Sequence, residues 1–179
     1  PSTTKTPPAN IVSEFRITST QVGAIRKGMT IKELYAALPE DRIKKLKTRT
    51  ELSNETADYY YIYGDSSRLL LIVNTERQND ERSRISRLIV KDKRFQTASG
   101  IGLASTVGTI RTAYPHSQFL PSVDEIILYV PEIDANFEIN KRLLPPSLAI
   151  DSTGEIAPDS IPAQTKVTDL SIFWDYSIK

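Results

Sequence analysis

GMTIKELYAALP at residues 28–39 and ASTVGTIRTAYP at residues 104–115 are two similar segments around which the whole chain is organised. They align without gaps, with Thr30 over Thr106 and Pro39 over Pro115, which is an offset of 76 in the numbering. Apolar residues recur at helical spacing in both segments. Each segment therefore predicts a short helix, and their likeness predicts an internal repeat.

The ends of both helices are marked by residues with a physical role. Thr30 and Thr106 stand at the N-cap, where a hydroxyl accepts a hydrogen bond from a backbone N–H of the first turn. Glu33 completes a capping box in the first segment. Pro39 and Pro115 end the helices, because the residue before a proline is driven out of helical geometry.

Beyond each helix the pattern changes to the period of two that is typical of strands. Aromatic and branched residues concentrate in six runs, at residues 58–63, 68–73, 84–90, 125–130, 135–139 and 166–174. Turn-forming residues separate the runs. We expect an antiparallel β-meander of three strands after each helix.

The repeat extends into these strands with a change of spacing. Tyr61 aligns with Phe137 at the same offset of 76, whereas Leu88 aligns with Leu170 at an offset of 82. The difference predicts about six extra residues in the second copy, which we assign to the proline-rich stretch 144–162. The predicted fold is α+β, with a polar tether at 1–11, a first module at 12–94 and a second at 95–179.

Composition limits the possible functions. The chain is 39% apolar and 25% charged, enough for a buried core, and its net charge of +1 gives no general attraction to nucleic acid. Residues 1–94 carry a net charge of +6 and residues 95–179 a net charge of −5, which favours packing of the halves or head-to-tail pairing of chains. No run approaches the roughly 18 apolar residues of a membrane helix.

The first ten residues, PSTTKTPPAN, are too polar to fold alone. They fit either a tether that follows a removed signal segment, as behind the acylated cysteine of a lipoprotein, or an arbitrary boundary. The absence of cysteine from the sequence fits either an exported protein or an ordinary small bacterial domain.

The first segment, from Val22 to Pro39 with Ile25, Gly28, Met29, Thr30 and Leu34, resembles the fold group of β-lactamase inhibitor protein and of SmpA/OmlA-type outer-membrane lipoproteins. The second segment departs from it, with Ala104-Ser105 in place of Gly-Met. The phrase at residues 95–102 is similar to one in exported proteins of the Bacteroidetes type. The resemblance implies tandem helix-and-sheet modules, a location in the periplasm or cell envelope, and a role in binding proteins or scaffolding complexes.

The inventory of reactive groups argues against catalysis. The single histidine, His116, follows a helix end and fits an ordinary surface residue, so we assign no catalytic residue. Carboxylates at 124–125, 132–134 and 151–155 lack the spacing of a calcium loop, and we predict no metal. Gly100 and Gly102 lack the third glycine of a dinucleotide fingerprint, so we predict no cofactor and assign both to a close approach of the backbone to the sheet.

Two features remain as candidate binding surfaces. The run RIKKLKTR at 42–49, with Lys44, Lys45 and Lys47, either attracts an acidic partner or forms an edge strand protected by lysines, with Ile43 and Leu46 pointing inward. In the run 59–63, alternation separates Tyr60 and Ile62 from Tyr59, Tyr61 and Tyr63.

Because Tyr61 aligns with Phe137 and Tyr63 with Ile139, we expect Tyr61 and Tyr63 to pack under the helix. Tyr60 and Ile62 then lie on the open face of the sheet, either as a binding surface or as cross-strand packing residues. Trp174 shares its parity with Leu170 and Ile172 and is expected in the core.

We therefore expect a non-enzymatic, exported protein that binds an envelope protein or other macromolecule, either free or tethered to the membrane by an N-terminal lipid. A carbohydrate- or lipid-binding accessory module is the second hypothesis, and a small hydrolase using acidic residues is the third. A flat aromatic face favours protein binding, and an exposed stripe of aromatic residues favours carbohydrate or lipid binding. Clustered carboxylates with raised pKa favour a hydrolase.

Overall fold

The computed structural model describes residues 14–49, 56–122, 125–148, 156–157 and 160–174. The expected tether at 1–11 and the carboxylates Asp124, Asp151 and Glu155 lie outside the described residues. The described chain has mixed α and β content, with two short α-helices and mostly antiparallel sheet.

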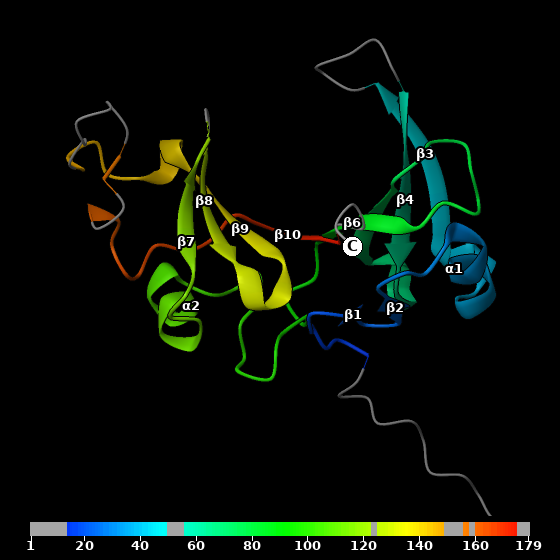
Figure 1. The fold of residues 1–179 in the computed structure, drawn as a ribbon, viewed down its shortest axis with the longest axis horizontal. Coiled ribbons are helices and arrows are strands. Elements are labelled where there is room, and N and C mark those ends of the chain that lie inside the picture. Colours follow the sequence, from blue (N-terminus) through cyan, green and yellow to red (C-terminus); the bar gives the residue numbers. More distant parts are fainter. Residues whose placement is uncertain (1–13, 50–55, 123–124, 149–155, 158–159, 175–179) are drawn as a thin grey trace, which may run out of the picture.

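The strands form a small hairpin and a large antiparallel sheet. The hairpin pairs β1 (Gln21–Val22) with β2 (Ile25–Arg26). The eight strands of the large sheet, in spatial order, are β3 (Ile43–Arg49), β4 (Thr56–Tyr63), β5 (Leu69–Thr75), β6 (Ile85–Val90), β10 (Asp169–Phe173), β9 (Ala135–Asn140), β8 (Glu125–Val130) and β7 (Gln118–Pro121). Figure 1 shows the sheet running from β7 to β3, with α2 (Val107–Ala113) and α1 (Ile31–Ala37) beside its two halves.

Both helices begin as the sequence predicts. The hydroxyl of Thr30 accepts from the backbone N–H of Glu33, whose carboxylate in turn accepts from the backbone N–H of Thr30 at 2.8 Å. Thr106 and Thr109 make the same reciprocal pair in α2, with a hydroxyl in place of the carboxylate. These bonds satisfy N–H groups that a helix end otherwise leaves without partners.

Each helix start is also attached, by the same set of backbone hydrogen bonds, to the segment that leads into the last strand of its half. In the first half the donor–acceptor pairs are Ile31 to Ser83, Lys32 to Glu81 and Ile85 to Met29, at 2.9 to 3.3 Å. In the second half they are Val107 to Thr165, Gly108 to Ala163 and Val167 to Ser105, at 2.8 to 3.3 Å. The residues on the helix side are offset by 76 in the numbering and those on the sheet side by 82, the two offsets found in the sequence.

The centre of the sheet is the antiparallel pair β6 and β10. Leu88 lies opposite Ile172 and Val90 opposite Leu170, so the last strands of the two meanders join them into one sheet. Ile89 lies opposite Ser171 between these two apolar pairs. The sequence predicts both strands but gives no sign that they pair.

The position of β4 in its half corresponds to that of β8, and β5 to β9. The alignment of Tyr61 with Phe137 was therefore wrong, because it matched the second strand of one half with the third strand of the other. Counted outward from the central pair, Ile62 holds the place of Val130. Alternating strands of similar composition allow such a shift.

The predicted six-residue insertion was too small. The connection between β5 and β6 spans residues 76–84, whereas the one between β9 and β10 spans residues 141–168. The longer connection of the second half contains the region where we expected the insertion, 144–162, but the other connections of that half are shorter. The difference between the two offsets therefore underestimates the length of the insertion.

The core lies on one face of the sheet, which we call the inner face. A cross-strand row of buried side chains runs through Ile43, Ile62, Leu71, Val90, Leu170, Phe137 and Leu128. Both helices cover this face: Tyr35 of α1 contacts Tyr60 edge-on at 6.4 Å between ring centroids, and Arg111 of α2 lies over Phe119 at 5.6 Å. Trp174 is buried as expected, with 1% exposure.

The segment between the halves packs against the beginning of the described chain. Phe95 contacts Phe15 edge-on at 5.1 Å, and the backbone of Gln96 bridges to Arg16. A Cβ atom on Gly102 would lie 2.2 Å from the carbonyl oxygen of Phe95, so the backbone approaches closely there, although Phe95 lies outside the strands. The close approach expected at Gly100 was wrong, because a Cβ atom there would have nothing within 4 Å. Neither α-helix of the described residues has the length and apolar character needed to cross a lipid bilayer.

The central pair predicts how the protein unfolds. Ile172 is fully buried in β10, which pairs with both β6 and β9, so Ile172→Ala should lower the free energy of unfolding by roughly 2–5 kcal/mol. Both halves should lose stability together. Urea unfolding followed by hydrogen exchange of β4 and β8 amides measures this.

The matched control is Phe173→Ala, one residue further along and 39% exposed, for which we expect less than about 1 kcal/mol. Loss of protection in β8 alone after Ile172→Ala would show that the halves are independent units.

Candidate functional site

The structure buries two residues that we expected on the open face. Tyr60 is 2% exposed and Ile62 is 4% exposed, because both point to the inner face beneath α1. The expectation was wrong because it rested on the mistaken match between β4 and β9. Tyr60 and Ile62 therefore pack in the core.

The opposite face, which we call the outer face, carries the other tyrosines of β4. Cross-strand neighbours in one row are Lys44, Tyr61, Ile72, Ile89 and Ser171. Tyr59 and Tyr61 are half-buried, as are Ile72 and Ile89. Leu46 is 38% exposed and Phe173 39% exposed on the same face. The described helices both lie on the other side of the sheet.

The lysine run forms β3, an edge strand, as one of the two interpretations predicted. The expectation that Ile43 and Leu46 both point inward was wrong. Residues three apart in a strand lie on opposite faces, and here Ile43 is buried while Leu46 is exposed. Lys44 lies on the outer face opposite Tyr61, and Lys47 lies opposite Asp58 on the inner face.

Lys45 is bound to a buried carboxylate. Its ammonium group lies 2.9 Å from Asp58 Oδ2 and 5.4 Å from the centroid of the Tyr60 ring. The side chain of Asp58 is 2% exposed, and the same oxygen accepts from the backbone N–H of Asn79 at 2.9 Å. Burial acts to raise the pKa of Asp58, but these hydrogen bonds lower it overall. The bond to Asp58 raises the pKa of Lys45.

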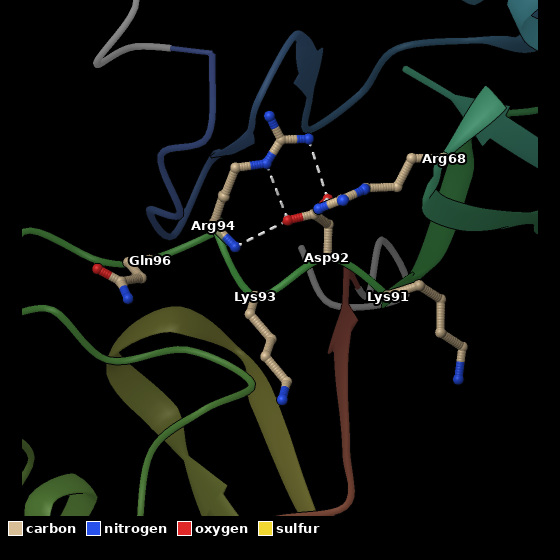
Figure 2. A pocket seen from close by; sticks show the side chains of 6 residues that line it. All are labelled: Arg68, Lys91, Asp92, Lys93, Arg94 and Gln96. Carbon is tan, nitrogen blue, oxygen red and sulfur yellow. Dashed lines mark hydrogen bonds and ion pairs between the residues drawn. The ribbon is translucent and has the colours of Figure 1, made fainter. Parts of the chain in front are cut away.

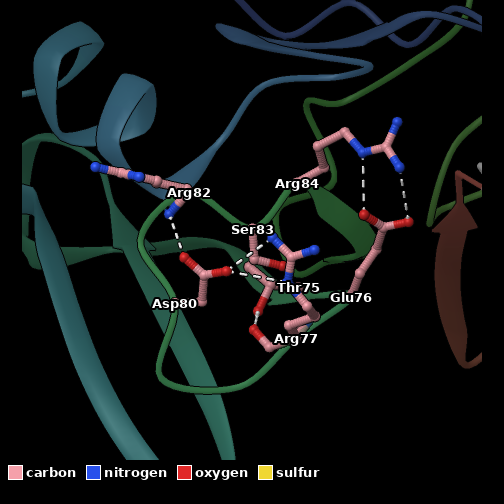
Figure 3. A network of polar contacts seen from close by, with 7 residues as sticks. All are labelled: Thr75, Glu76, Arg77, Asp80, Arg82, Ser83 and Arg84. Carbon is pink, nitrogen blue, oxygen red and sulfur yellow. Dashed lines mark hydrogen bonds and ion pairs between the residues drawn. The ribbon is translucent and has the colours of Figure 1, made fainter.

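The connection between β5 and β6, which contacts Asp58, is itself held by polar contacts among its own residues (Figure 3). Arg77 Nη2 lies 2.8 Å from Asp80 Oδ2, and Arg84 Nε lies 3.0 Å from Glu76 Oε2. The hydroxyl of Ser83 accepts from the backbone N–H of Arg77 at 2.8 Å. The same connection donates to Asp58 and accepts from the first turn of α1. Its charged groups therefore have a structural role.

A depression of about 700 Å³ lies where the first half meets the second (Figure 2). Its walls are mainly basic, and we call it the basic depression; the lining residues are Arg68, Lys91, Asp92, Lys93, Arg94 and Gln96. Figure 2 shows the guanidinium groups of Arg68 and Arg94 next to Asp92, with the side chains of Lys91 and Lys93 extending away from it.

Asp92 is the one acidic residue of this lining, and its side chain is 3% exposed. Arg94 donates to it through Nε and Nη2, both at 3.0 Å, and through its backbone N–H at 2.9 Å. The side-chain bonds of Arg94 lower the pKa of Asp92 against the opposing effect of burial. Arg94 also lies 4.0 Å from the centroid of the Phe15 ring.

Sequence reasoning missed the basic depression. The run KDKR at 91–94 was a local signal, but Arg68 belongs to the turn before β5 and only the fold brings it there. The run lies just before the boundary predicted between the modules. A basic run at a predicted boundary between modules was therefore the one sequence feature that could have indicated this depression.

Acidic groups gather on the outer face of the second half. Burial, and then the nearby Glu125, raise the pKa of Glu138. Arg87 Nη2 lies 3.9 Å from Glu138 Oε1, and the Ser171 hydroxyl lies 3.4 Å from the same atom. Asp134 forms a salt bridge of 3.4 Å with Lys27. His116 is exposed. Among the described residues no group of acidic or histidine side chains has the geometry to hold a metal ion.

Comparison with known proteins shows the fold alone. No family model matches the chain, and no curated protein matches it significantly. Among solved structures it is similar to the uncharacterized protein YfeY from Escherichia coli, with a TM-score of 0.58 and 11% sequence identity. The match covers 88% of this chain and 99% of that one.

The buried ion pair predicts a pH-dependent stability. Lys45→Ala leaves Asp58 buried without its cation and should cost roughly 2–3 kcal/mol at neutral pH. Because the pKa of Asp58 is lowered by folding, this contribution is complete above the unfolded value of about 3.9 and is lost as the pH falls through the folded value. The difference from wild type should therefore shrink in acid, as urea unfolding at a series of pH values measures.

Lys47→Ala is the control, because it removes the neighbouring lysine and should change stability by about 0.5 kcal/mol or less. An equal loss from both substitutions would contradict a specific role for Lys45.

For Glu138 we expect the opposite dependence of stability on pH. Its raised pKa means that the folded state holds the proton more tightly, so stability is lost as the pH rises from the unfolded value of about 4.3 through the folded value. Glu138→Gln should raise the Tm at neutral pH by about 1–3 °C and have little effect in acid. Calorimetry at both pH values tests this, with Glu132→Gln, an exposed carboxylate, as control. A lower Tm for Glu138→Gln at neutral pH would refute it.

Proposed function

We propose that this chain is a non-enzymatic, exported binding or scaffolding protein that contacts a protein partner through the outer face of its sheet. The observation that carries the proposal is the placement of both described helices on the inner face. An eight-stranded sheet is left with a second broad face that no described helix covers.

The residues of the outer face support a contact role. A solvated face of an antiparallel sheet usually carries polar residues at its outward positions. Here Tyr59, Tyr61, Ile72 and Ile89 stand at outward positions, and Phe173 is exposed. Aromatic residues dominate the energy of protein interfaces, since they bury much area with few rotatable bonds. A flat aromatic face is also what distinguishes protein binding from the two alternatives.

We also infer that the two halves are copies of one module. Two features that recur support this. The reciprocal N-cap hydrogen bonds are found in both helices, and three backbone hydrogen bonds join each helix start to the segment before the last strand, at the two offsets of 76 and 82 found in the sequence. Tandem modules of this kind agree with the resemblance to β-lactamase inhibitor protein and to SmpA/OmlA-type lipoproteins. A location in the periplasm or cell envelope, with an N-terminal lipid tether, follows from that resemblance.

Glu138 favours a second candidate function, a small hydrolase. A carboxyl group with a raised pKa next to a second carboxyl is what a general acid requires. Binding remains the better proposal, because the Arg87 guanidinium and the Ser171 hydroxyl stand beside Glu138 and oppose its role as a free acid.

The outer face is tested with a double variant, Tyr61→Ala with Phe173→Ala. Both side chains are partly exposed, so the fold should remain while the contact surface is lost. Purified protein is cross-linked in envelope extract, partners are identified by mass spectrometry, and the affinity of each purified partner is then measured. We expect the double variant to bind at least about tenfold more weakly.

Leu143→Ala is the matched control, because Leu143 is 72% exposed and lies in a short 3-10 helix outside the sheet. It should leave affinity unchanged. Equal affinity of the double variant and the wild type for every partner would exclude the outer face.

A further inference from the structure

The basic depression holds more positive charge than its own carboxylate neutralises. Arg94 donates three hydrogen bonds to Asp92, which leaves Arg68 Nη1 at 3.7 Å from Asp92 Oδ2, beyond hydrogen-bond distance. Lys91 pairs instead with Asp169, at 2.6 Å. Within the described part of the chain, Lys93 has no ion-pair partner. Arg68 thus keeps only a long ion pair with Asp92 and is 66% exposed, so Arg68 and Lys93 can still interact with an external anion.

Arg94 gives the depression a rigid side. Its guanidinium is held on one edge by Asp92 and on one face by the ring of Phe15. It is still 51% exposed, so N–H groups that Asp92 does not use face solvent. A guanidinium that is already ordered loses little entropy when it binds a ligand.

We propose that the basic depression binds the phosphate group of a ligand. A phosphate offers several strong acceptor oxygens, and the guanidinium group of arginine is well suited to bind them. Arg68 and the outward N–H groups of Arg94 contact the phosphate, and Lys93, whose side chain extends away from Asp92 (Figure 2), adds positive charge at the rim of the depression. A metal cation would be repelled by the same residues.

The phosphate belongs either to a small soluble compound or to the headgroup of an anionic phospholipid. Both offer the same group to Arg68, Lys93 and Arg94. The position of the depression at the edge of the junction, next to exposed Lys91 and Gln96, leaves space for the rest of either ligand.

The test uses inorganic phosphate titrated into labelled protein, with backbone amide shifts as the readout. We expect saturable shifts centred on residues 91–96. The double variant Arg68→Gln with Lys93→Gln should raise the Kd for phosphate by about tenfold or more, because it removes one charged contact and a second positive charge nearby. Arg94 is kept, since its loss would leave Asp92 buried without its main partner.

The control variant, Lys32→Gln with Lys47→Gln, removes the same charge elsewhere and should change the Kd by less than about twofold at moderate salt. Cosedimentation with phosphatidylcholine vesicles, with and without phosphatidylglycerol, separates the two sources. Binding that needs phosphatidylglycerol and is lost in the Arg68/Lys93 variant supports a headgroup, and phosphate binding without vesicle binding supports a soluble ligand. Shifts that do not saturate, or an equal Kd in the two double variants, would overturn the proposal.

Discussion

The hydrogen-bonded pair of β6 and β10 is the interaction on which the rest of the structure depends. Each half by itself would end in an unpaired strand whose inner side is fully apolar, as Leu88 and Val90 are in β6 and Leu170 and Ile172 are in β10. Unpaired apolar edges promote aggregation. Joining them hides both edges and leaves free edges only at the far ends of the sheet, where β3 carries lysines and β7 ends at a proline.

The same pairing determines what each face of the sheet can do. Because the register is continuous across the junction, inward positions of both halves form one core, and outward positions form one broad surface. The two seven-residue helices attach on the inner side through backbone hydrogen bonds to the connections that precede β6 and β10. A surface broad enough to contact another protein is thus a consequence of joining two small sheets.

Local chemistry made part of this predictable. The helix starts at Thr30 and Thr106 depend on hydroxyls within a few residues of the bonds they make, and both were predicted. The outward side of β4 was not, because the choice between Tyr60 and Tyr61 depends on which strand of the other half is equivalent. The second half has one long connection and several short ones, and these differences in length partly cancel in the numbering. The offset of 76 was therefore correct for the helices, but it aligned β4 with β9 instead of β8. Burial of Tyr60 follows from the fold alone.

Two buried aspartates show why one charged group is structural and the other points to a ligand. Asp58 is satisfied by Lys45 and by the backbone of the β5–β6 connection, so that its cation is consumed within the fold. Asp92 is also satisfied, mainly by Arg94 and at a longer distance of 3.7 Å by Arg68, and Lys91 and Lys93 line the same depression. The single carboxylate of Asp92 cannot balance the positive charges of Arg68, Lys93 and Arg94 together, so repulsion among them remains. A bound anion would offset this repulsion. The basic depression therefore differs from the lysines of β3 in its unbalanced positive charge, and not in its number of basic residues.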